Sequence, residues 1–180
     1  MWRLPGRVVV RIARPGQEAA AACEAAVARW LGGQGLPAVS PLAIGQPVVV
    51  SGRAVTFWHE LPEHRQGSAA DLCVLLRQPH GLPLPDEDRL GLAVGLLDPF
   101  VRTRDRIEAA EAMPESGRAF LPGERERLRA GWDTLSADWP VRLIHGDAWR
   151  GNCAVTDDGR RCLLDCERTS VGPPAWDLTS

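Results

Sequence analysis

Residues 141–167 read VRLIHGDAWRGNCAVTDDGRRCLLDCE, and this stretch decides the fold of the chain. It alternates an apolar run, a polar loop, a second apolar run, a tight turn and a third apolar run. The turn, Asp157-Asp-Gly-Arg160, lies between two short apolar runs, a pattern typical of a β-hairpin. The stretch therefore predicts a strand, a loop and a hairpin in succession.

Polar side chains gather at the open end of this predicted hairpin. Asp147 and Asn152 lie in the loop before it, and Asp165 ends its second strand. The hairpin would bring together two carboxylates and a carboxamide, hard oxygen ligands that suit Mg²⁺. Because Mg²⁺ in proteins keeps several waters and shares its remaining coordination with phosphates, the sequence predicts a site for Mg²⁺ and a phosphate-bearing ligand.

The spacing within this stretch matches a known motif. His145-x-Asp147-x-x-x-x-Asn152, followed by an aspartate after an apolar strand, has the order of the protein-kinase catalytic loop and its metal-binding aspartate. The form His-Gly-Asp-x-x-x-Gly-Asn resembles the aminoglycoside phosphotransferase family, small-molecule kinases of protein-kinase-like fold. Residues 172–178, GPPAWDL, resemble that family's Gly-x-Pro-x-x-Asp-Leu segment.

The resemblance implies an α+β, protein-kinase-like fold of two lobes. Residues 1–62 would form a partial N-lobe that binds the nucleotide, with a small antiparallel sheet and one helix. Residues 63–180 would form a partial, mainly helical C-lobe that carries the catalytic hairpin. The implied reaction transfers the γ-phosphate of ATP, with Mg²⁺, to a hydroxyl of a small molecule such as an aminoglycoside-like compound.

The same resemblance implies a role for each motif residue. Asp147 is the expected catalytic base, which orients the substrate hydroxyl and accepts its proton, a contribution of about 10²–10⁴-fold in rate. Asn152 and Asp165 are the expected Mg²⁺ ligands. His145 would tie the catalytic loop to the metal-binding segment, and Asp177 would anchor that loop. Without the family, Asp147 reads as a turn residue and Asp177 as a helix N-terminal acid.

A basic residue and an acidic residue near the N-terminus are expected to position the phosphates. Arg11 lies in the β-branched run of residues 8–13, which resembles the third strand of the kinase N-lobe, where a basic residue contacts the α- and β-phosphates. An arginine suits this role because its planar fork binds phosphate in a bidentate manner. Glu24, on the following predicted helix, is its expected partner. The alternatives are an outward-facing strand arginine and a solvated helix carboxylate.

Residues 59–62, HELP, resemble the hinge between the two lobes. The backbone groups of Glu60 and Leu61 are expected to hydrogen-bond the adenine. Glu167, two residues after Asp165, is a candidate outer partner of the metal site. Pro79 precedes a histidine at a position where the family usually has leucine, and we expect it to break the helix there and displace His80.

Periodicity and capping residues predict the remaining elements. Apolar spacing predicts helices over residues 17–31, 68–77, 99–112 and 123–139, with loops over 82–98 and 113–122. Two antiparallel strands are expected on either side of Gly52, over residues 47–51 and 53–58. Ser68 and Asp71 have the spacing of a capping box at the start of the second helix.

Composition narrows the class of protein. The 180 residues carry a formal charge of −2, which gives no general electrostatic attraction to nucleic acid. There is no lysine, so a phosphate contact that a lysine would normally make must come from arginine or backbone N–H groups. The N-terminus has no signal-peptide pattern and no apolar run reaches membrane-spanning length, so the expected location is the cytoplasm, without a membrane partner.

The five cysteines read as reduced core thiols, with a zinc site of Cys153, Cys162 and Cys166 as the less favoured alternative.

Both ends of the chain depart from the family pattern. The family's Gly-rich hairpin would precede residues 8–13, and its last helices would follow Ser180, so we expect a domain shortened at both ends, with apolar surface left uncovered. The leading hypothesis is the phosphotransferase. The alternatives are an inactive remnant that at most binds Mg·ATP and, ranked last, a metal-dependent phosphohydrolase. The sequence identifies neither the acceptor nor an oligomeric state.

Overall fold

The computed structural model describes residues 1–86, 91, 94–135 and 139–179. These residues form two compact units, one made of residues 1–95 with 141–180 and the other of residues 96–140. The first unit contains every residue that the sequence places in a site. The mixed helices and antiparallel sheets confirm the predicted α+β class.

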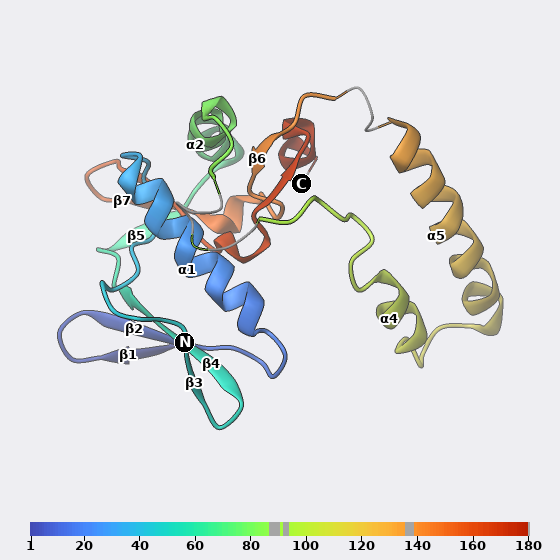
Figure 1. Ribbon diagram of the computed structural model, residues 1–180, viewed down its shortest axis with the longest axis horizontal. Coiled ribbons are helices and arrows are strands. Elements are labelled where there is room, and N and C mark those ends of the chain that lie inside the picture. The colour runs from blue at the N-terminus through green and yellow to red at the C-terminus, as the bar shows by residue number, and fades with distance from the viewer. Residues whose placement is uncertain (87–90, 92–93, 136–138, 180) are drawn as a thin grey trace. The chain divides into compact units, whose positions relative to one another are not determined.

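A four-stranded antiparallel sheet begins the first unit (Figure 1). Its strands, in spatial order, are β1 (Trp2–Leu4), β2 (Val8–Ile12), β4 (Arg53–His59) and β3 (Val48–Val50). Ser51 and Gly52 both have positive φ, 49° and 70°, which is the backbone of a type I′ turn between β3 and β4. The two strands predicted around Gly52 are therefore confirmed.

Helix α1 (Glu18–Gly33) connects this sheet to the rest of the unit (Figure 1). One side of α1 packs Ala25 and Ala28 against Trp58 of β4. Its other side contributes Val27 and Leu31 to a second, larger cluster. Because the helix is apolar on two sides, it fixes the β2–β4 sheet against the part of the chain that carries the catalytic motif.

The C-terminal half of the first unit is built around the predicted hairpin. Strands β7 (Cys153–Thr156) and β8 (Arg161–Leu163) pair antiparallel, and β5 (His64–Gln66) adds to the β7 edge. Gly159, with φ of +81°, makes the turn, so the hairpin is confirmed. Strands β6 (Arg142–Ile144) and β9 (Ser170–Gly172) form a second pair, which places the end of the chain beside the start of the motif.

Helix α2 (Ala69–Gly81) covers the hairpin and completes the larger cluster. The expected capping box is present, since the Ser68 hydroxyl accepts the Asp71 N–H and the Asp71 carboxylate accepts the Ser68 N–H. The buried residues of the cluster come from α1, α2 and the motif region: Val27, Leu31, Leu72, Leu75, Leu76, Ala148, Cys153, Val155, Leu163 and Cys166.

The expectation that Pro79 ends the second helix is wrong. Helix α2 continues through Pro79 to Gly81, and the Leu82 N–H then bonds the Pro79 carbonyl. A proline near the end of a helix removes one hydrogen bond and leaves few later turns to be disturbed. His80 is consequently held on the helix, where it reaches Asp177.

Helix α5 (Glu115–Leu135) and the short helix α4 (Thr103–Glu108) form the second unit. Two predictions are wrong here: the helix expected over residues 99–112 is confined to α4, and α5 begins at Glu115 rather than at residue 123, with Pro122 inside it. Turns precede α4, and the carbonyl of Pro114 accepts the first N–H groups of α5. The helix is described as far as Leu135, and residues 136–138, just before its predicted end at residue 139, lie outside those described.

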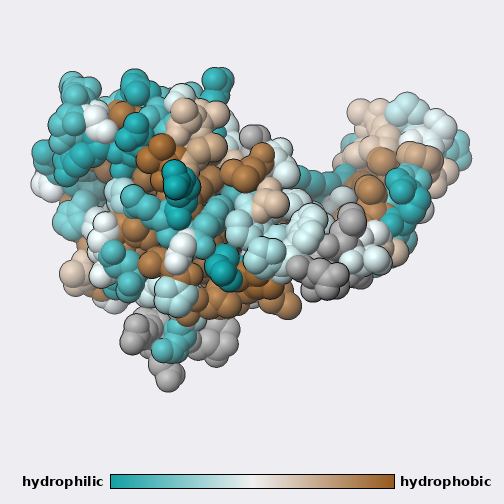
Figure 2. All heavy atoms as spheres, turned by 90° about the horizontal axis from the view of Figure 1, so that it is seen from above, coloured by the Kyte–Doolittle hydropathy of each residue, from teal (hydrophilic) through white to brown (hydrophobic). Residues whose placement is uncertain are grey.

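Large apolar side chains are exposed on both units, as the brown side chains in Figure 2 show. On the second unit they include Leu96, Phe120 and Leu128. No helix among the described residues is both long and apolar enough to cross a membrane.

The cysteines are free thiols, three of them buried. Burial raises the pKa of Cys162 to about 11, so this thiol stays protonated at neutral pH. Among the described residues, only Glu24, Asp165 and Glu167 bring three His, Cys, Asp or Glu ligand atoms within 4.8 Å of one another. The alternative of a zinc site from Cys153, Cys162 and Cys166 is therefore wrong.

Candidate active site

The buried carboxylate of Asp177 holds the backbone of the catalytic-loop motif. Asp177, 3% exposed, accepts the backbone N–H groups of His145 at 2.8 Å and Gly146 at 2.9 Å. His80 on α2 contacts the same carboxylate through Nε2 at 2.9 Å. The sequence analysis expects Pro79 to displace His80, whereas the structure holds this histidine against Asp177. Backbone donors to a buried carboxylate hold a loop rigidly, because breaking them would leave a charge without partners.

Gly146 lets the loop pass close to a neighbouring segment. Its φ is +79°, and a Cβ at this position would lie 2.1 Å from the carbonyl oxygen of Arg168. The Gly146 carbonyl in turn accepts the indole N–H of Trp176 at 3.1 Å. Both the backbone conformation and the lack of space require glycine here.

His145 links the loop to the segment that carries Asp165. Its Nε2 lies 2.8 Å from the carbonyl oxygen of Leu164, and its Nδ1 lies 3.3 Å from the backbone N of Asp147. A carbonyl accepts and an N–H donates, so the neutral ring carries its proton on Nε2. The ring is 3% exposed and thus joins two loops from within the core.

Asn152 is buried at 6% exposure, and its Nδ2 donates to the Asp147 carbonyl oxygen at 2.8 Å. This contact leaves the Asn152 side-chain oxygen as the atom available to a cation. The backbone of Asn152 also accepts the Leu164 N–H at 2.9 Å. Asn152 and Asp165 are thus held on adjacent strand ends by one local network.

Arg11 on β2 lies among three carboxylates. Its Nη1 contacts Glu24 Oε1 at 2.6 Å and Asp165 Oδ1 at 2.9 Å, and its Nη2 contacts Glu167 Oε2 at 2.7 Å. The structure therefore brings the expected Arg11–Glu24 pair together. It also adds two contacts that the sequence did not predict, because the direction of Asp165 and Glu167 depends on the left-handed backbone at Asp165, with φ of 55°.

Burial and charge shape the protonation of this cluster. Burial alone would lower the pKa of Arg11, but Glu24, Asp165 and Glu167 together raise it, so the guanidinium stays charged. Burial, opposed by Arg11, raises the pKa of Glu24 to about 7. The second oxygen of Glu24, Oε2, is buried without a hydrogen-bond partner among the described residues.

One pocket of about 630 Å³ collects most of the predicted site residues. Arg11, Asn152 and Asp165 line its polar end, together with Glu24. The hinge residues Glu60 and Leu61 and the apolar side chains Val9, Val39, Trp58 and Leu164 line the rest. Asp147 lies outside the lining, on the half-buried loop next to Asn152. The pocket thus pairs an apolar slot with a charged end.

The hinge offers fewer backbone groups than expected. The Glu60 N–H already donates to the Arg7 carbonyl at 2.8 Å, and the Glu60 side chain pairs with Arg3 at 2.9 Å. Among the described residues, the Glu60 carbonyl and the backbone of Leu61 have no hydrogen-bond partner.

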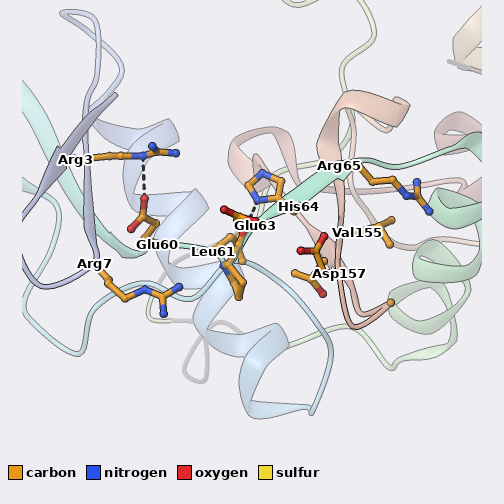
Figure 3. A pocket seen from close by; sticks show the side chains of 12 residues that line it. Arg3, Arg7, Glu60, Leu61, Glu63, His64, Arg65, Val155 and Asp157 are labelled. Carbon is orange, nitrogen blue, oxygen red and sulfur yellow. Dashed lines mark hydrogen bonds and ion pairs between the residues drawn. The ribbon is translucent and has the colours of Figure 1, made fainter.

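A second, more open pocket of about 930 Å³ adjoins the hinge (Figure 3). Figure 3 shows the Arg3–Glu60 pair and Arg7 on one side of it and Asp157 of the β7–β8 turn on the other. It shares Arg3, Glu60, Leu61 and His64 with the first pocket but includes none of the motif residues. The site chemistry therefore belongs to the smaller pocket.

The donor set of the smaller pocket suits a divalent cation. Glu24 and Asp165 line this pocket beside the Arg11 guanidinium, and the Glu24 Oε2 atom is buried without a hydrogen-bond partner among the described residues. Asn152 adds a further hard oxygen atom at the pocket wall. Such an oxygen-rich set fits Mg²⁺ better than softer metals.

Comparison with protein-family models matches residues 2–180 to the phosphotransferase enzyme family. The chain belongs to this family. Family membership and the kinase-like fold account for the order of the motif and for the strand–helix–strand arrangement that supports Arg11 and Glu24. A comparison with curated protein sequences finds no match.

Solved structures of family members share the fold at low identity. The chain is similar to aminoglycoside phosphotransferase APH(3'')-Id from Streptomyces rimosus, with 21% identity and a TM-score of 0.69 over 98% of this chain and 70% of that one. It is similar to choline kinase LicA from Streptococcus pneumoniae, with 17% identity and a TM-score of 0.64 over 98% and 61%.

A third structure, the GDP and kanamycin complex of APH(2")-IIia, gives 15% identity and a TM-score of 0.66 over 97% of this chain and 65% of that one. The chain thus spans between 61% and 70% of the length of these three structures.

Proposed function

We propose that this protein transfers the γ-phosphate of ATP, with Mg²⁺, to a hydroxyl group of a small molecule. The observation that carries the proposal is the pocket that joins the hinge at one end to Arg11, Asn152 and Asp165 at the other. An apolar slot for a base that opens onto an arginine and onto oxygen atoms suited to a metal ion is what a nucleoside triphosphate requires.

The nucleotide would lie with its base between Val9, Val39 and Trp58 and its phosphates at Arg11. Three of the five guanidinium N–H groups already donate to carboxylates. The other two, on Nε and Nη2, have no partner among the described residues and are free to bind a phosphate. Arg11 thus combines a fixed position with available donors, as charge-assisted phosphate binding needs.

Asn152 and Asp165 would hold Mg²⁺ beside those phosphates. When bound, the metal supplies neutralisation of the charge on the transferring phosphoryl group. Asp165 Oδ1 is paired with Arg11 at 2.9 Å, which leaves the other carboxylate oxygen, Oδ2, to act as a ligand.

Asp147 would serve the acceptor. Its carboxylate orients the substrate hydroxyl and takes its proton as the hydroxyl oxygen bonds to the γ-phosphorus. The bond from that phosphorus to the β,γ-bridging oxygen breaks, and ADP leaves. The Asp177 and His145 contacts support this role because they fix the two residues before Asp147 and the N–H of Asp147 itself.

The names of similar solved structures support the choice of acceptor class. These structures include enzymes named for aminoglycosides and for choline, all small hydroxylated molecules. We propose that the acceptor is a small hydroxylated molecule of this kind. We also propose that the protein acts in the cytoplasm.

Titration of the purified chain with ATP, with and without Mg²⁺, tests the proposal by thermal shift. Saturation at about 100 times the dissociation constant stabilises the folded state by about 2.7 kcal/mol. We expect a Mg²⁺-dependent shift that Asp165→Ala removes and Asp147→Ala retains. ADP release should then appear when a panel of aminoglycosides, choline and other small alcohols is added, and should be lost in Asp147→Ala.

Each failure has a distinct meaning. Binding of Mg·ATP without phosphate transfer to any acceptor would favour the inactive remnant. A chain that melts cooperatively but shows no ATP-dependent shift would refute the nucleotide site itself. Transfer that survives in Asp147→Ala would refute the base assignment alone.

A further inference from the structure

Glu167 is the one carboxylate around Arg11 without a role in the proposed reaction. Asp165 is the expected metal ligand, and Glu24 is the partner that the kinase-like fold provides for Arg11. Glu167 contacts the other nitrogen of the guanidinium at 2.7 Å, as close as an ordinary charge-assisted hydrogen bond allows. Its side chain is 28% exposed, similar to the 29% of Arg11, so the contact is partly shielded from water.

The contacts from Glu24 and Glu167 hold the two terminal nitrogens of the planar Arg11 guanidinium. Glu24 Oε1 accepts a hydrogen bond from Nη1, and Glu167 Oε2 accepts one from Nη2. A guanidinium gripped at both nitrogens cannot rotate about its long axis without breaking one of these bonds. A lysine ammonium has no such plane to fix, and this chain has no lysine.

Glu167 projects from a rigid support. It lies in the short 3₁₀ turn Cys166–Arg168, which packs closely against α1. Cys166 is fully buried in the larger cluster, and the Thr169 N–H bonds the Cys166 carbonyl at 3.2 Å. Glu24 comes from α1 itself, so both ends of the guanidinium are held by elements that are packed together.

We propose that Glu167 is a positioning residue that orients the Arg11 guanidinium so that its two free N–H groups face the nucleotide phosphates. The proposal rests on the proposed function, because it assumes that Arg11 binds the phosphates. Glu167 acts through Arg11 and touches neither the phosphates nor the metal. Removing the Glu167 carboxylate leaves the charge of Arg11 in place but lets the guanidinium plane rotate.

A double-mutant cycle tests this assignment. ATP affinity is measured by titration calorimetry, with Mg²⁺ and with EDTA, for the wild type, Glu167→Ala, Arg11→Ala and the double variant. We expect Glu167→Ala to weaken ATP binding about threefold to tenfold in the wild-type background. In the Arg11→Ala background the same change should alter affinity by less than about twofold.

Two further variants sharpen the result. Glu167→Gln keeps an oxygen that accepts from Nη2 and should restore part of the lost affinity. Glu124→Ala is the matched control, because Glu124 is 30% exposed and pairs with Arg127 at 2.7 Å in the other unit. It should leave ATP affinity unchanged.

Each other outcome overturns a specific claim. An equal loss in both backgrounds, or no loss in either, refutes the positioning role. A loss that occurs only with Mg²⁺ and persists in Arg11→Ala would make Glu167 a metal ligand. A wild type that binds no ATP under any condition would refute the proposed function, and the positioning role with it.

Discussion

Replacing Gly146 by alanine should loosen the catalytic loop. The added Cβ would lie 2.1 Å from the Arg168 carbonyl oxygen and 3.0 Å from its carbonyl carbon, both backbone atoms that cannot rotate away. The same peptide segment donates to Asp177 and accepts from Trp176. The loop must therefore move, and the backbone of Asp147 moves with it.

The destabilisation has two separable parts. Adopting the left-handed backbone, with φ of +79°, costs an alanine about 1–2 kcal/mol. Forcing the chain apart around a packed methyl group costs about 1–3 kcal/mol more. The expected loss of stability is therefore about 2–5 kcal/mol, and each kcal/mol lowers the melting temperature of a chain of this size by about 2–4 °C.

Gly159 provides the control for the first part. It has a similar φ of +81° in the β7–β8 turn, but a Cβ there would meet nothing within 4 Å. Gly159→Ala should cost only about 1–2 kcal/mol. Thermal and urea unfolding of both variants, with ATP affinity as a second measurement, gives the comparison. Equal destabilisation of the two variants would refute the argument from the Arg168 contact.

Three other changes have defined outcomes. His80→Ala removes one partner of the buried Asp177 carboxylate and should cost about 1–3 kcal/mol in urea unfolding; unchanged stability would show that the two backbone N–H donors suffice. Ser68→Ala removes the side-chain acceptor at the start of α2 and should cost about 1 kcal/mol by the same assay, with a loss below the experimental error counting against the cap. The pKa of Glu24 is raised from 4.5 to about 7 in the folded state, so the native protein binds more protons than the unfolded chain in that pH range and loses stability as the pH rises. Glu24→Gln removes this dependence, so its stability relative to the wild type should rise by about 1–3 kcal/mol from pH 4.5 to 7, and a fall would contradict the assignment.

The parts of the fold that depend on short-range chemistry could be predicted. The turn at Gly159, the capping box at Ser68 and the strands on either side of Gly52 are each determined by a few adjacent residues. The pairing of Arg11 with Glu24 followed from the family resemblance and not from the residues themselves, because strand alternation does not tell which face is covered.

The errors arose where distant contacts outweigh local preference. Pro79 disfavours a helix locally, yet α2 continues because its last turn is held through His80 to Asp177, 97 residues away in sequence. The sequence predicts a loop up to Pro122 and a helix from residue 123, whereas α5 begins at Glu115 and includes this proline. The side chain of Glu167 points toward Arg11 because Asp165 has a positive φ, and no local sequence pattern predicts that backbone conformation.

The contacts of Asp177 also bear on the order in which the chain folds. They join residues separated by 32 and 97 positions, so the ends of long loops must meet before the catalytic motif gains its anchor. Closing such loops costs entropy that local hairpins and helices avoid. We therefore expect the β7–β8 hairpin and α2 to form early and the backbone of residues 145–147 to become ordered last. Substitutions at Asp177 should then speed unfolding while leaving the folding rate nearly unchanged.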